Sequence, residues 1–268
     1  MTLFADAPRP ASRPTPILAV EAVTKRFGGH AAVDQLSLSV PPGLIAGLIG
    51  PNGAGKSTLF DLLAGRQSPT QGRILYEGQS IERRPAHRRA ALGIGRTFQI
   101  PRPFGALSVR DNVMLGRQHH PGERLLPNFL QPARVVEAER AARRDADELL
   151  AFVSLGHLAG SPARVLSGGQ RKLLELARVM MGQPRLLLLD EPAAGVNPSL
   201  LETIMEKVAA IAARGVTVFL IEHNMDLVSR LCGHVFVMAE GRLLCEGAPA
   251  VVVRDPRVIE AYLGTGAA

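Results

Sequence analysis

Short apolar runs alternate with turns along the first part of the chain. The runs ILAVEAVTKRF, which begins at Ile17, and LIAGLIG, which ends at Gly50, have the length and composition of strands. The second run leads into a glycine-rich loop, and Lys56–Ala64 follows as a helix. Another strand is predicted at Arg73–Tyr76. Because strands and helices alternate in sheets covered by helices, this part of the chain predicts an α/β fold.

The pattern changes to helix alone between about Val109 and Ser161. Apolar residues recur there at the spacing of one helical face; the stripe comprises Val135, Ala138, Ala142, Leu149, Leu150 and Val153. Later, Leu186–Leu189 and Val216–Ile221 are apolar throughout, which is typical of parallel strands buried on both faces. We therefore predict an α/β core with a helical insertion.

Two adjacent glycines stand in the first turn of a strongly predicted helix. Ser167 precedes Gln170 by three residues, the spacing of a capping box, so the helix begins here. Each glycine inside a helix costs roughly 1 kcal/mol relative to alanine. Gly168 and Gly169 should therefore destabilise the start of this helix. Glycine is favoured there only if another group must approach the backbone closely.

A glycine-rich loop between a predicted strand and a predicted helix carries the strongest chemical signal. Its sequence, GPNGAGKST, has the spacing of a P-loop, in which backbone N–H groups converge on a polyphosphate. Lys56 is predicted to hold the β- and γ-phosphates, and Ser57 to coordinate Mg²⁺. The predicted phosphate loop comprises Gly50, Pro51, Asn52, Gly53, Ala54, Gly55, Lys56, Ser57 and Thr58.

Polar residues also follow other predicted strands. Asp190 and Glu191 end a buried strand, where ionised carboxylates are costly without a cation or hydrogen-bond donors. We assign Asp190 to the magnesium shell and Glu191 to polarising the attacking water as a general base. Gln99, after GIGRTF, is predicted to reach Mg²⁺ and this water, and His223 to reach the γ-phosphate. Taken alone, a histidine at a strand end is more often a hydrogen-bonded loop residue.

Composition and charge narrow the classes of protein to which this chain can belong. The longest apolar runs are shorter than the roughly 18 residues that suggest a membrane span, and residues 1–16 lack the apolar core of a secretory signal. We therefore expect a disordered leader at 1–16 and a cytoplasmic protein. The formal net charge is +7, but arginines are scattered and aromatic residues make up only 4%, which argues against a nucleic-acid surface. The densest basic cluster, ERRPAHRRA from Glu82 to Ala90, is predicted to be a solvated helix. Cys232 and Cys245 lack metal-ligand spacing and are predicted to be buried, reduced thiols.

Taken together, these residues resemble the nucleotide-binding subunit of ABC transporters from Ile17 to Gly264. GPNGAGKST is similar to the Walker A motif, RTFQ to the Q-loop, LSGGQ to the ABC signature, LLLLDE to Walker B with the catalytic glutamate, and IEH to the switch histidine. The resemblance implies an α/β P-loop NTPase core with a mixed sheet and an antiparallel β subdomain. It also implies a single domain at 17–268 with a helical subdomain inserted at about 109–182.

The same resemblance implies a head-to-tail dimer around two ATP molecules. The phosphate loop and the polar strand-end residues would act on one nucleotide, and Phe27 would stack on its adenine. The signature residues would contact the nucleotide of the partner subunit; they are Ser167, Gly168, Gly169 and Gln170. Stacking makes no hydrogen bonds to the edges of the base, so the sequence does not predict how selective the site is for adenine.

Four segments resemble one branch of the family, the ATPases of branched-chain amino acid uptake systems and their urea or amide relatives. These segments are AAGVNP, RTFQIPRPF, IEHNMDLV and the tail VIEAYLG. The resemblance implies an ATPase that uses ATP and Mg²⁺ and drives integral-membrane permease subunits. It would lie at the cytoplasmic face of the inner membrane.

Other partners and other functions follow from the same resemblance. A second ATPase subunit, identical or related, is expected, and an external solute-binding protein would act indirectly. One alternative is an importer for urea, amides or other small polar solutes. Another is a soluble ABC ATPase that acts on nucleic acid; such proteins usually carry tandem cassettes, coiled-coil arms or zinc sites, which this sequence lacks, so no nucleic-acid partner is expected.

Overall fold

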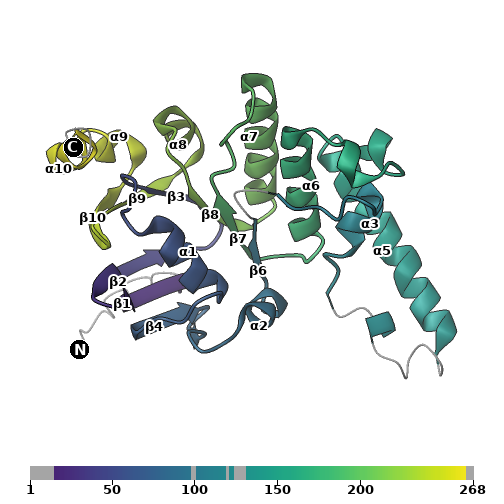
Figure 1. The fold of residues 1–268 in the computed structure, drawn as a ribbon, viewed down its shortest axis with the longest axis horizontal. Helices are drawn as coiled ribbons and strands as arrows, with labels where there is room; N and C mark the ends of the chain where they lie inside the picture. Colours follow the sequence, from purple (N-terminus) through teal and green to yellow (C-terminus); the bar gives the residue numbers. More distant parts are fainter. Residues whose placement is uncertain (1–14, 98–100, 119–120, 124–130, 264–268) are drawn as a thin grey trace, which may run out of the picture.

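The computed structural model describes residues 15–97, 101–118, 121–123 and 131–263, which form two sheets and a set of helices (Figure 1). The strands are β1 (Leu18–Phe27), β2 (His30–Val40), β3 (Ile45–Ile49), β4 (Gln71–Tyr76), β5 (Gln79–Ser80), β6 (Ile94–Arg96), β7 (Leu186–Asp190), β8 (Thr217–Ile221), β9 (His234–Ala239) and β10 (Arg242–Gly247). The helices are α1 (Lys56–Ala64), α2 (Ala86–Ala91), α3 (Val109–Met114), α5 (Pro132–Phe152), α6 (Gly168–Met180), α7 (Pro198–Ala213), α8 (Met225–Leu231), α9 (Pro249–Val252) and α10 (Pro256–Leu263). Residues 1–14 of the predicted leader and Gln99 lie outside the described residues.

A six-stranded mixed sheet, in the order β10-β9-β3-β8-β7-β6, forms the centre of the molecule. Its strands are parallel except for β10, which pairs antiparallel with β9. Every residue of β7 and β8 is buried, which confirms the two buried strands predicted from their apolar runs. The sheet therefore has the α/β architecture predicted from the sequence.

Two hydrophobic cores lie on opposite faces of this sheet. Leu186 and Leu188 belong to the core shared with α1, whereas Leu187 and Leu189 belong to the core shared with α6 and α7. Alternate residues of one strand thus hold different helices in place. Strands β3, β7 and β8 run parallel, so their carboxyl ends meet at one edge, where the phosphate loop and the predicted polar residues follow.

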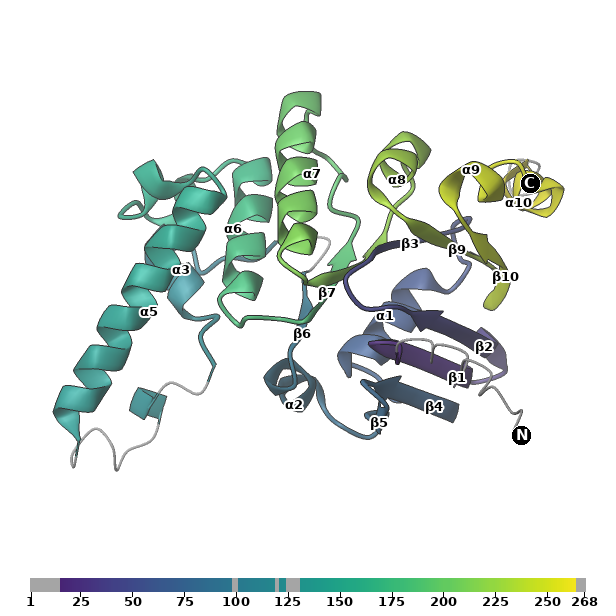
Figure 2. The ribbon, with the colours of Figure 1, turned by 180° about the vertical axis from the view of Figure 1, so that it is seen from behind.

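A second, antiparallel sheet in the order β2-β1-β4-β5 lies beside α1 (Figures 1 and 2). Strand β1 ends at Phe27, and a tight turn with Gly28 at φ 58° leads directly into β2. This turn brings Phe27 and the first residues of β2 next to the phosphate loop. The antiparallel β subdomain predicted by the family resemblance is confirmed.

Helices α3, α5 and α6 gather at one end of the molecule, and α5 extends beyond its neighbours (Figures 1 and 2). Of the predicted apolar stripe on α5, Ala142, Leu150 and the adjoining Val153 are buried, whereas Val135 and Ala138 are half-exposed. The first part of the stripe is not fully buried, because the first turns of α5 project past the other helices. Among the described residues, no helix has the length and hydrophobicity needed to cross a lipid bilayer.

The basic segment around α2 is less solvated than its composition suggests. The prediction of a solvated helix is wrong for Arg89, which is only 1% exposed. Its guanidinium donates to the carbonyl oxygens of Leu62 (2.6 Å) and Leu63 (2.9 Å) in the last turn of α1. Burial lowers the pKa of Arg89 to about 10, while Glu82 opposes the shift. Arg89 therefore satisfies carbonyls at the end of the helix that carries the phosphate loop.

Candidate functional site

The phosphate loop leaves the carboxyl end of β3 and opens α1, as predicted. Gly50, Gly53 and Gly55 have φ values of 147°, 79° and 94°. A Cβ atom at Gly50 would lie 2.0 Å from the carbonyl oxygen of Met238, and one at Gly55 would lie 2.1 Å from that of Ala32. The loop therefore needs glycine both for its backbone conformation and because neighbouring strands pack closely against it.

The ammonium group of Lys56 is held by the loop itself. The residue is 6% exposed, and its Nζ donates to the carbonyl oxygens of Gly50 (2.7 Å) and Pro51 (2.8 Å). Burial lowers the pKa of Lys56, and the charge of Glu191 opposes this shift. A phosphate would offer this cation a charged acceptor in place of neutral carbonyls, which gives a stronger hydrogen bond.

A hollow of about 370 Å³ lies over the phosphate loop. Phe27, predicted to stack on adenine, is 49% exposed in its lining, and Lys25 Nζ lies 5.1 Å from the centre of its ring. The sequence did not single out His30 and Ala32, whose only signal is their position just after Phe27. The lining residues are Phe27, His30, Ala32, Asn52, Gly53, Ala54, Gly55, Lys56, Ser57, Thr58, Glu191 and His223.

Glu191 and His223 meet at the ends of β7 and β8. These strands pair in parallel with Asp190 opposite Ile221, so the residues that follow them are neighbours. Nε2 of His223 lies 2.8 Å from Oε1 of Glu191. Glu191 has φ 48°, which is uncommon for a residue other than glycine, and its N–H donates to the carbonyl oxygen of Ile221 (3.1 Å). The strand ends thus place a carboxylate and an imidazole beside the phosphate loop.

Asp190 is balanced by an arginine that the sequence did not reveal. Arg96 on β6 donates from one nitrogen to Asp190 (3.1 Å) and from the other to Asp61 (2.6 Å). Burial raises the pKa of Asp190, and the hydrogen bond and charge of Arg96 lower it. The sequence predicted that a carboxylate here needs a cation and assigned Mg²⁺ to that role. In the structure the cation beside Asp190 is Arg96.

The oxygen atoms of Ser57 and Asp190 nevertheless suit a magnesium ion. A hydroxyl and a carboxylate are ligands that Mg²⁺ combines with phosphates and water. Among the described residues, no group of three or more His, Cys, Asp or Glu side chains is placed to hold a metal ion. The donors therefore fit a metal that phosphate oxygens also coordinate. Gln99, the third predicted ligand, lies outside the described residues.

The signature turn, which we define as Ser167, Gly168, Gly169 and Gln170, begins α6 with the predicted capping box. Ser167 Oγ accepts from the Gln170 N–H (3.3 Å), and Gln170 Oε1 accepts from the Ser167 N–H (3.0 Å). A Cβ at Gly168 would meet nothing within 4 Å, whereas one at Gly169 would lie 1.8 Å from Cδ2 of Leu200. Packing within the chain therefore restricts Gly169, a reason that the sequence did not reveal. These four described residues are not part of the lining of the phosphate-loop hollow.

The last helix, α10, reaches the phosphate loop. The hydroxyl oxygen of Tyr262 accepts a hydrogen bond from the Gly50 N–H (2.8 Å), and Val258 anchors the same helix in the core. Burial raises the pKa of Tyr262, and the bond from Gly50 lowers it. In the sequence the tail VIEAYLG marks only a branch of the family. The contact of Tyr262 with the phosphate loop joins residues 212 positions apart, so no local sequence pattern predicts it.

Comparisons with known proteins agree with this geometry. The family described as ABC transporter matches residues 33–194, and the family described as branched-chain amino acid ATP-binding cassette transporter matches residues 242–268. The chain is 38% identical over 248 residues to the probable branched-chain amino acid transport ATP-binding protein LivG of Archaeoglobus fulgidus, covering 92% of this chain and 95% of the relative. It is 39% identical over 250 residues to the high-affinity branched-chain amino acid transport ATP-binding protein BraF of Pseudomonas aeruginosa, covering 93% and 98%.

A solved structure shares the whole fold. It is a nucleotide-free ATP-binding cassette from an ABC transporter, with a TM-score of 0.80 and 36% sequence identity. The match covers 92% of this chain and 98% of that chain. The similarity therefore extends over both sheets and the helical end, as the resemblance of the motifs predicted.

Proposed function

The chain belongs to the ABC transporter family of ATP-binding proteins, and on this premise we propose that it is the ATP-hydrolysing subunit of an importer for branched-chain amino acids. One observation carries the proposal: Glu191 and His223, 2.8 Å apart, line the same hollow as the phosphate loop. Membership of the family supports ATP as the nucleotide and its hydrolysis as the reaction. The match at residues 242–268 and the names of the relatives support the class of cargo.

The phosphate loop binds the triphosphate in this proposal. The N–H groups at the start of α1 face the phosphates, and Lys56 exchanges its carbonyl acceptors for β- and γ-phosphate oxygens. Ser57 and Asp190 would hold Mg²⁺, which would supply positive charge at the phosphates. Phe27 stacks on adenine from the end of β1.

Glu191 acts as the general base. Its carboxylate takes a proton from the water whose oxygen bonds to the γ-phosphorus, while the bond to the bridging oxygen breaks and releases ADP and phosphate. His223 orients this carboxylate through the contact between Nε2 and Oε1, and it faces the γ-phosphate. Gln99, outside the described residues, is proposed to contact Mg²⁺ and the attacking water.

A second ATPase subunit, identical or related, completes the site. In a head-to-tail dimer the signature turn of each subunit contacts the nucleotide bound by the other. Two observations support this arrangement. The space over Gly168 is open, and the N-terminus of α6 offers backbone N–H groups to an anion.

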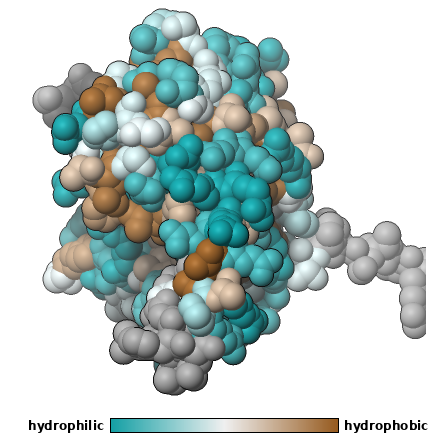
Figure 3. All heavy atoms as spheres, turned by 90° about the vertical axis from the view of Figure 1, so that its right-hand side faces the viewer, coloured by the Kyte–Doolittle hydropathy of each residue, from teal (hydrophilic) through white to brown (hydrophobic). Residues whose placement is uncertain are grey.

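The helical end of the molecule is the proposed contact for the permease. We assign it to a helical subdomain at about 109–182, inserted in a single domain at 17–268. Figure 3 looks at this end and shows hydrophobic residues gathered among hydrophilic ones. The large hydrophobic residues exposed in and next to this subdomain include Phe104, Leu107, Leu115, Val136 and Val165. The protein would thus bind permease subunits at the cytoplasmic face of the inner membrane, with an external solute-binding protein acting indirectly.

Replacing Glu191 by glutamine tests the chemistry. In the transporter reconstituted in vesicles, Glu191→Gln should lower ATP hydrolysis by at least about 100-fold, because the general base is lost. ATP affinity should change by less than about twofold. Glu202→Gln, at an exposed glutamate of α7 that pairs with Arg230, is the matched control and should keep the wild-type rate. A Glu191→Gln variant that hydrolyses ATP at the wild-type rate would contradict the assignment.

The cargo is tested by uptake. Vesicles that contain the permease, with ATP on the side of this subunit and the solute-binding protein outside, should accumulate radiolabelled leucine. Uptake of urea or acetamide in place of leucine would move the protein to the other branch of the importers. ATP hydrolysis stimulated by nucleic acid, with no transport of any solute, would show that the importer assignment is wrong.

A further inference from the structure

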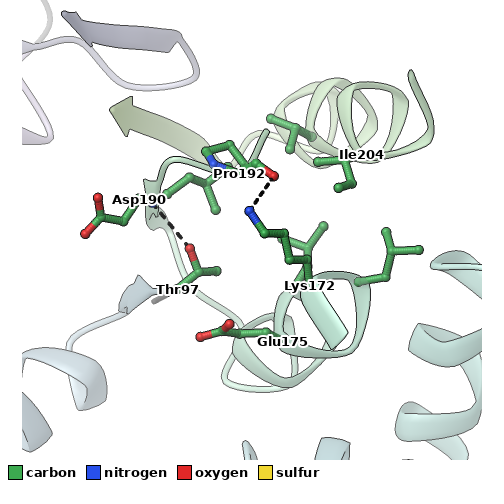
Figure 4. A pocket seen from close by; sticks show the side chains of 10 residues that line it. Thr97, Lys172, Glu175, Asp190, Pro192 and Ile204 are labelled. Carbon is green, nitrogen blue, oxygen red and sulfur yellow. Dashed lines mark hydrogen bonds between the residues drawn. The ribbon is translucent and has the colours of Figure 1, made fainter. Parts of the chain in front are cut away.

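Two side chains of opposite charge, the half-buried Lys172 and the buried Glu222, hold the turn that carries Glu191. Lys172 on α6 donates from Nζ to the carbonyl oxygens of Glu191 (3.0 Å) and Pro192 (3.1 Å). Figure 4 shows its side chain reaching from the helix to Pro192. From the other side, Oε1 of Glu222 accepts a hydrogen bond from the Ala193 N–H (2.8 Å). Three successive residues are thus fixed by side chains from two distant elements.

Glu222 also holds the backbone of the switch histidine. Its second oxygen, Oε2, accepts from the N–H of His223 (3.2 Å). The residue is 3% exposed, and burial raises the pKa of its carboxyl while the bonds from backbone N–H groups lower it. One buried carboxylate therefore links the turn after β7 with the segment after β8, where Glu191 and His223 approach each other.

Lys172 is half-buried in the region between α6, α7 and β7. A cavity of about 30 Å³ lies beside it, lined by Leu173, Leu176, Leu189 and Ile204 among others (Figure 4). Burial lowers the pKa of Lys172, and the nearby charges of Glu222, Glu191 and Glu175 oppose the shift. Hydrogen bonds from a charged donor in such a poorly solvated place are strong and directional.

The turn needs support because its backbone is strained. Glu191 has φ 48°, in the left-handed region that residues with a side chain rarely adopt. Such conformations persist only where the surrounding structure holds them. The direction of the Glu191 side chain depends on this backbone, so the groups that hold the turn also decide whether the carboxylate faces His223 and the phosphate loop.

We propose that Lys172 and Glu222 are positioning residues that fix the backbone of residues 191–193 and so aim the Glu191 carboxylate into the phosphate-loop hollow. The inference rests on the proposed role of Glu191 as general base. Lys172 belongs to the helix that begins with the signature turn, so this turn and the general base are joined through one side chain. Neither residue is part of the lining of the phosphate-loop hollow.

Substitution of Lys172 tests the proposal in the reconstituted transporter. Lys172→Met keeps the length of the side chain and removes its donors, and it should lower kcat about 10- to 100-fold because the base is misplaced. ATP affinity should stay within about twofold of wild type. Lys172→Arg keeps a donor at this place and should recover most of the rate. Lys207→Met is the matched control, since Lys207 is also half-buried but lies 5.3 Å from the ring centre of Phe152 on another face, and it should keep the wild-type kcat.

A double-mutant cycle separates positioning from a general loss of structure. If Lys172 acts through Glu191, adding Lys172→Met to Glu191→Gln should lower the residual rate by less than about twofold. Glu222→Gln should behave in the same way. Both carboxylate oxygens of Glu222 accept from backbone N–H groups, and in glutamine an NH₂ group would face one of these donors. A wild-type kcat in Lys172→Met, or an equal loss in the Glu191→Gln background, would overturn this inference alone. A wild-type rate in Glu191→Gln would overturn the role of the base and this inference with it.

Discussion

The phosphate loop and the signature turn both place glycines at the beginning of a helix, but their surroundings differ. At Gly50 and Gly55 an added Cβ would lie 2.0 and 2.1 Å from backbone carbonyl oxygens. At Gly168 it would meet no atom within 4 Å. Gly169 stands between these extremes, since its neighbour is the end of the flexible Leu200 side chain. The fold of one chain thus explains Gly50 and Gly55 fully, Gly169 in part, and Gly168 not at all.

This difference separates two kinds of glycine in a nucleotide-binding chain. Gly50 and Gly55 are required before any ligand arrives, because the β-strands next to them leave no room for a side chain. At Gly168 the chain itself leaves the space open, so packing within the chain does not require glycine there. Substitutions at these positions should therefore affect folding and turnover to very different degrees.

Gly55→Ala should have the largest effect on stability. The φ of 94° and the contact with the Ala32 carbonyl together should lower the free energy of unfolding by about 3 kcal/mol and abolish ATP binding. Urea unfolding and ATP titration of the isolated chain measure both. Gly43→Ala, at φ 71° with open space around it, should cost only about 1 kcal/mol. Equal losses in the two variants would show that contact with Ala32 does not matter.

Gly169→Ala should have a smaller effect because Leu200 can move. We expect a loss of about 1 to 2 kcal/mol in the free energy of unfolding. In a Leu200→Ala background, which opens the space, the same substitution should cost less than about 0.5 kcal/mol. If the cost is the same in both backgrounds, Leu200 is not the reason for glycine at this position. The contact also means that a charge introduced at Gly169 would disturb its own chain as well as a partner.

Tyr262→Phe should cost about 1 kcal/mol, because the Gly50 N–H loses its acceptor while the ring stays in place. Since this bond holds the start of the phosphate loop, ATP affinity of the isolated chain should fall about fivefold. Isothermal titration with ATP checks this value. Glu260→Gln, at an exposed position of the same helix, is the control and should bind ATP as wild type does. Unchanged affinity in Tyr262→Phe would show that α10 does not support the loop.

Gly168→Asp should have the smallest effect on stability and still stop turnover. A carboxylate in the first turn of α6 should change the free energy of unfolding by less than about 0.5 kcal/mol, since negative charge is favourable there. In the assembled transporter the same charge would repel the phosphates of the second nucleotide and lower ATP hydrolysis by at least about 10-fold. Gly168→Asn has the same shape without the charge and should keep most of the activity. Equal activity of Gly168→Asp and Gly168→Asn would show that the signature turn does not lie close to a phosphate group.

The sequence predicted those parts of the site whose residues are contiguous or follow paired strands. The phosphate loop is one uninterrupted motif, and Glu191 and His223 meet because β7 and β8 are neighbours in the sheet. Arg96 lies inside the RTFQ motif, but its contact with Asp190 was missed because the two residues are 94 positions apart and no local pattern pairs them. Glu222 also lies inside a predicted motif, IEH, and it was missed because its partner is a backbone N–H that no side-chain pattern reveals.

The same limit applies to the fold. A charged segment predicts a solvated helix, but Arg89 finds buried carbonyls at the end of α1, and this is a tertiary contact. The apolar stripe of α5 predicts burial along its length, but Val135 is only half-buried. It belongs to the first turn of α5, which extends beyond the neighbouring helices. Periodicity shows which face of a helix is able to pack. The arrangement of other elements decides how much of that face is covered.

The hydrogen bond between Tyr262 and Gly50 has a consequence for biosynthesis. It spans 212 residues, so a growing polypeptide that has already exposed its phosphate loop must wait for the rest of the chain. At roughly 5–20 residues per second, translation of that stretch takes about 10 to 40 s. During this interval the nascent protein carries a loop without its final support. A message truncated ahead of α10 would therefore yield a product whose phosphate loop lacks this hydrogen bond.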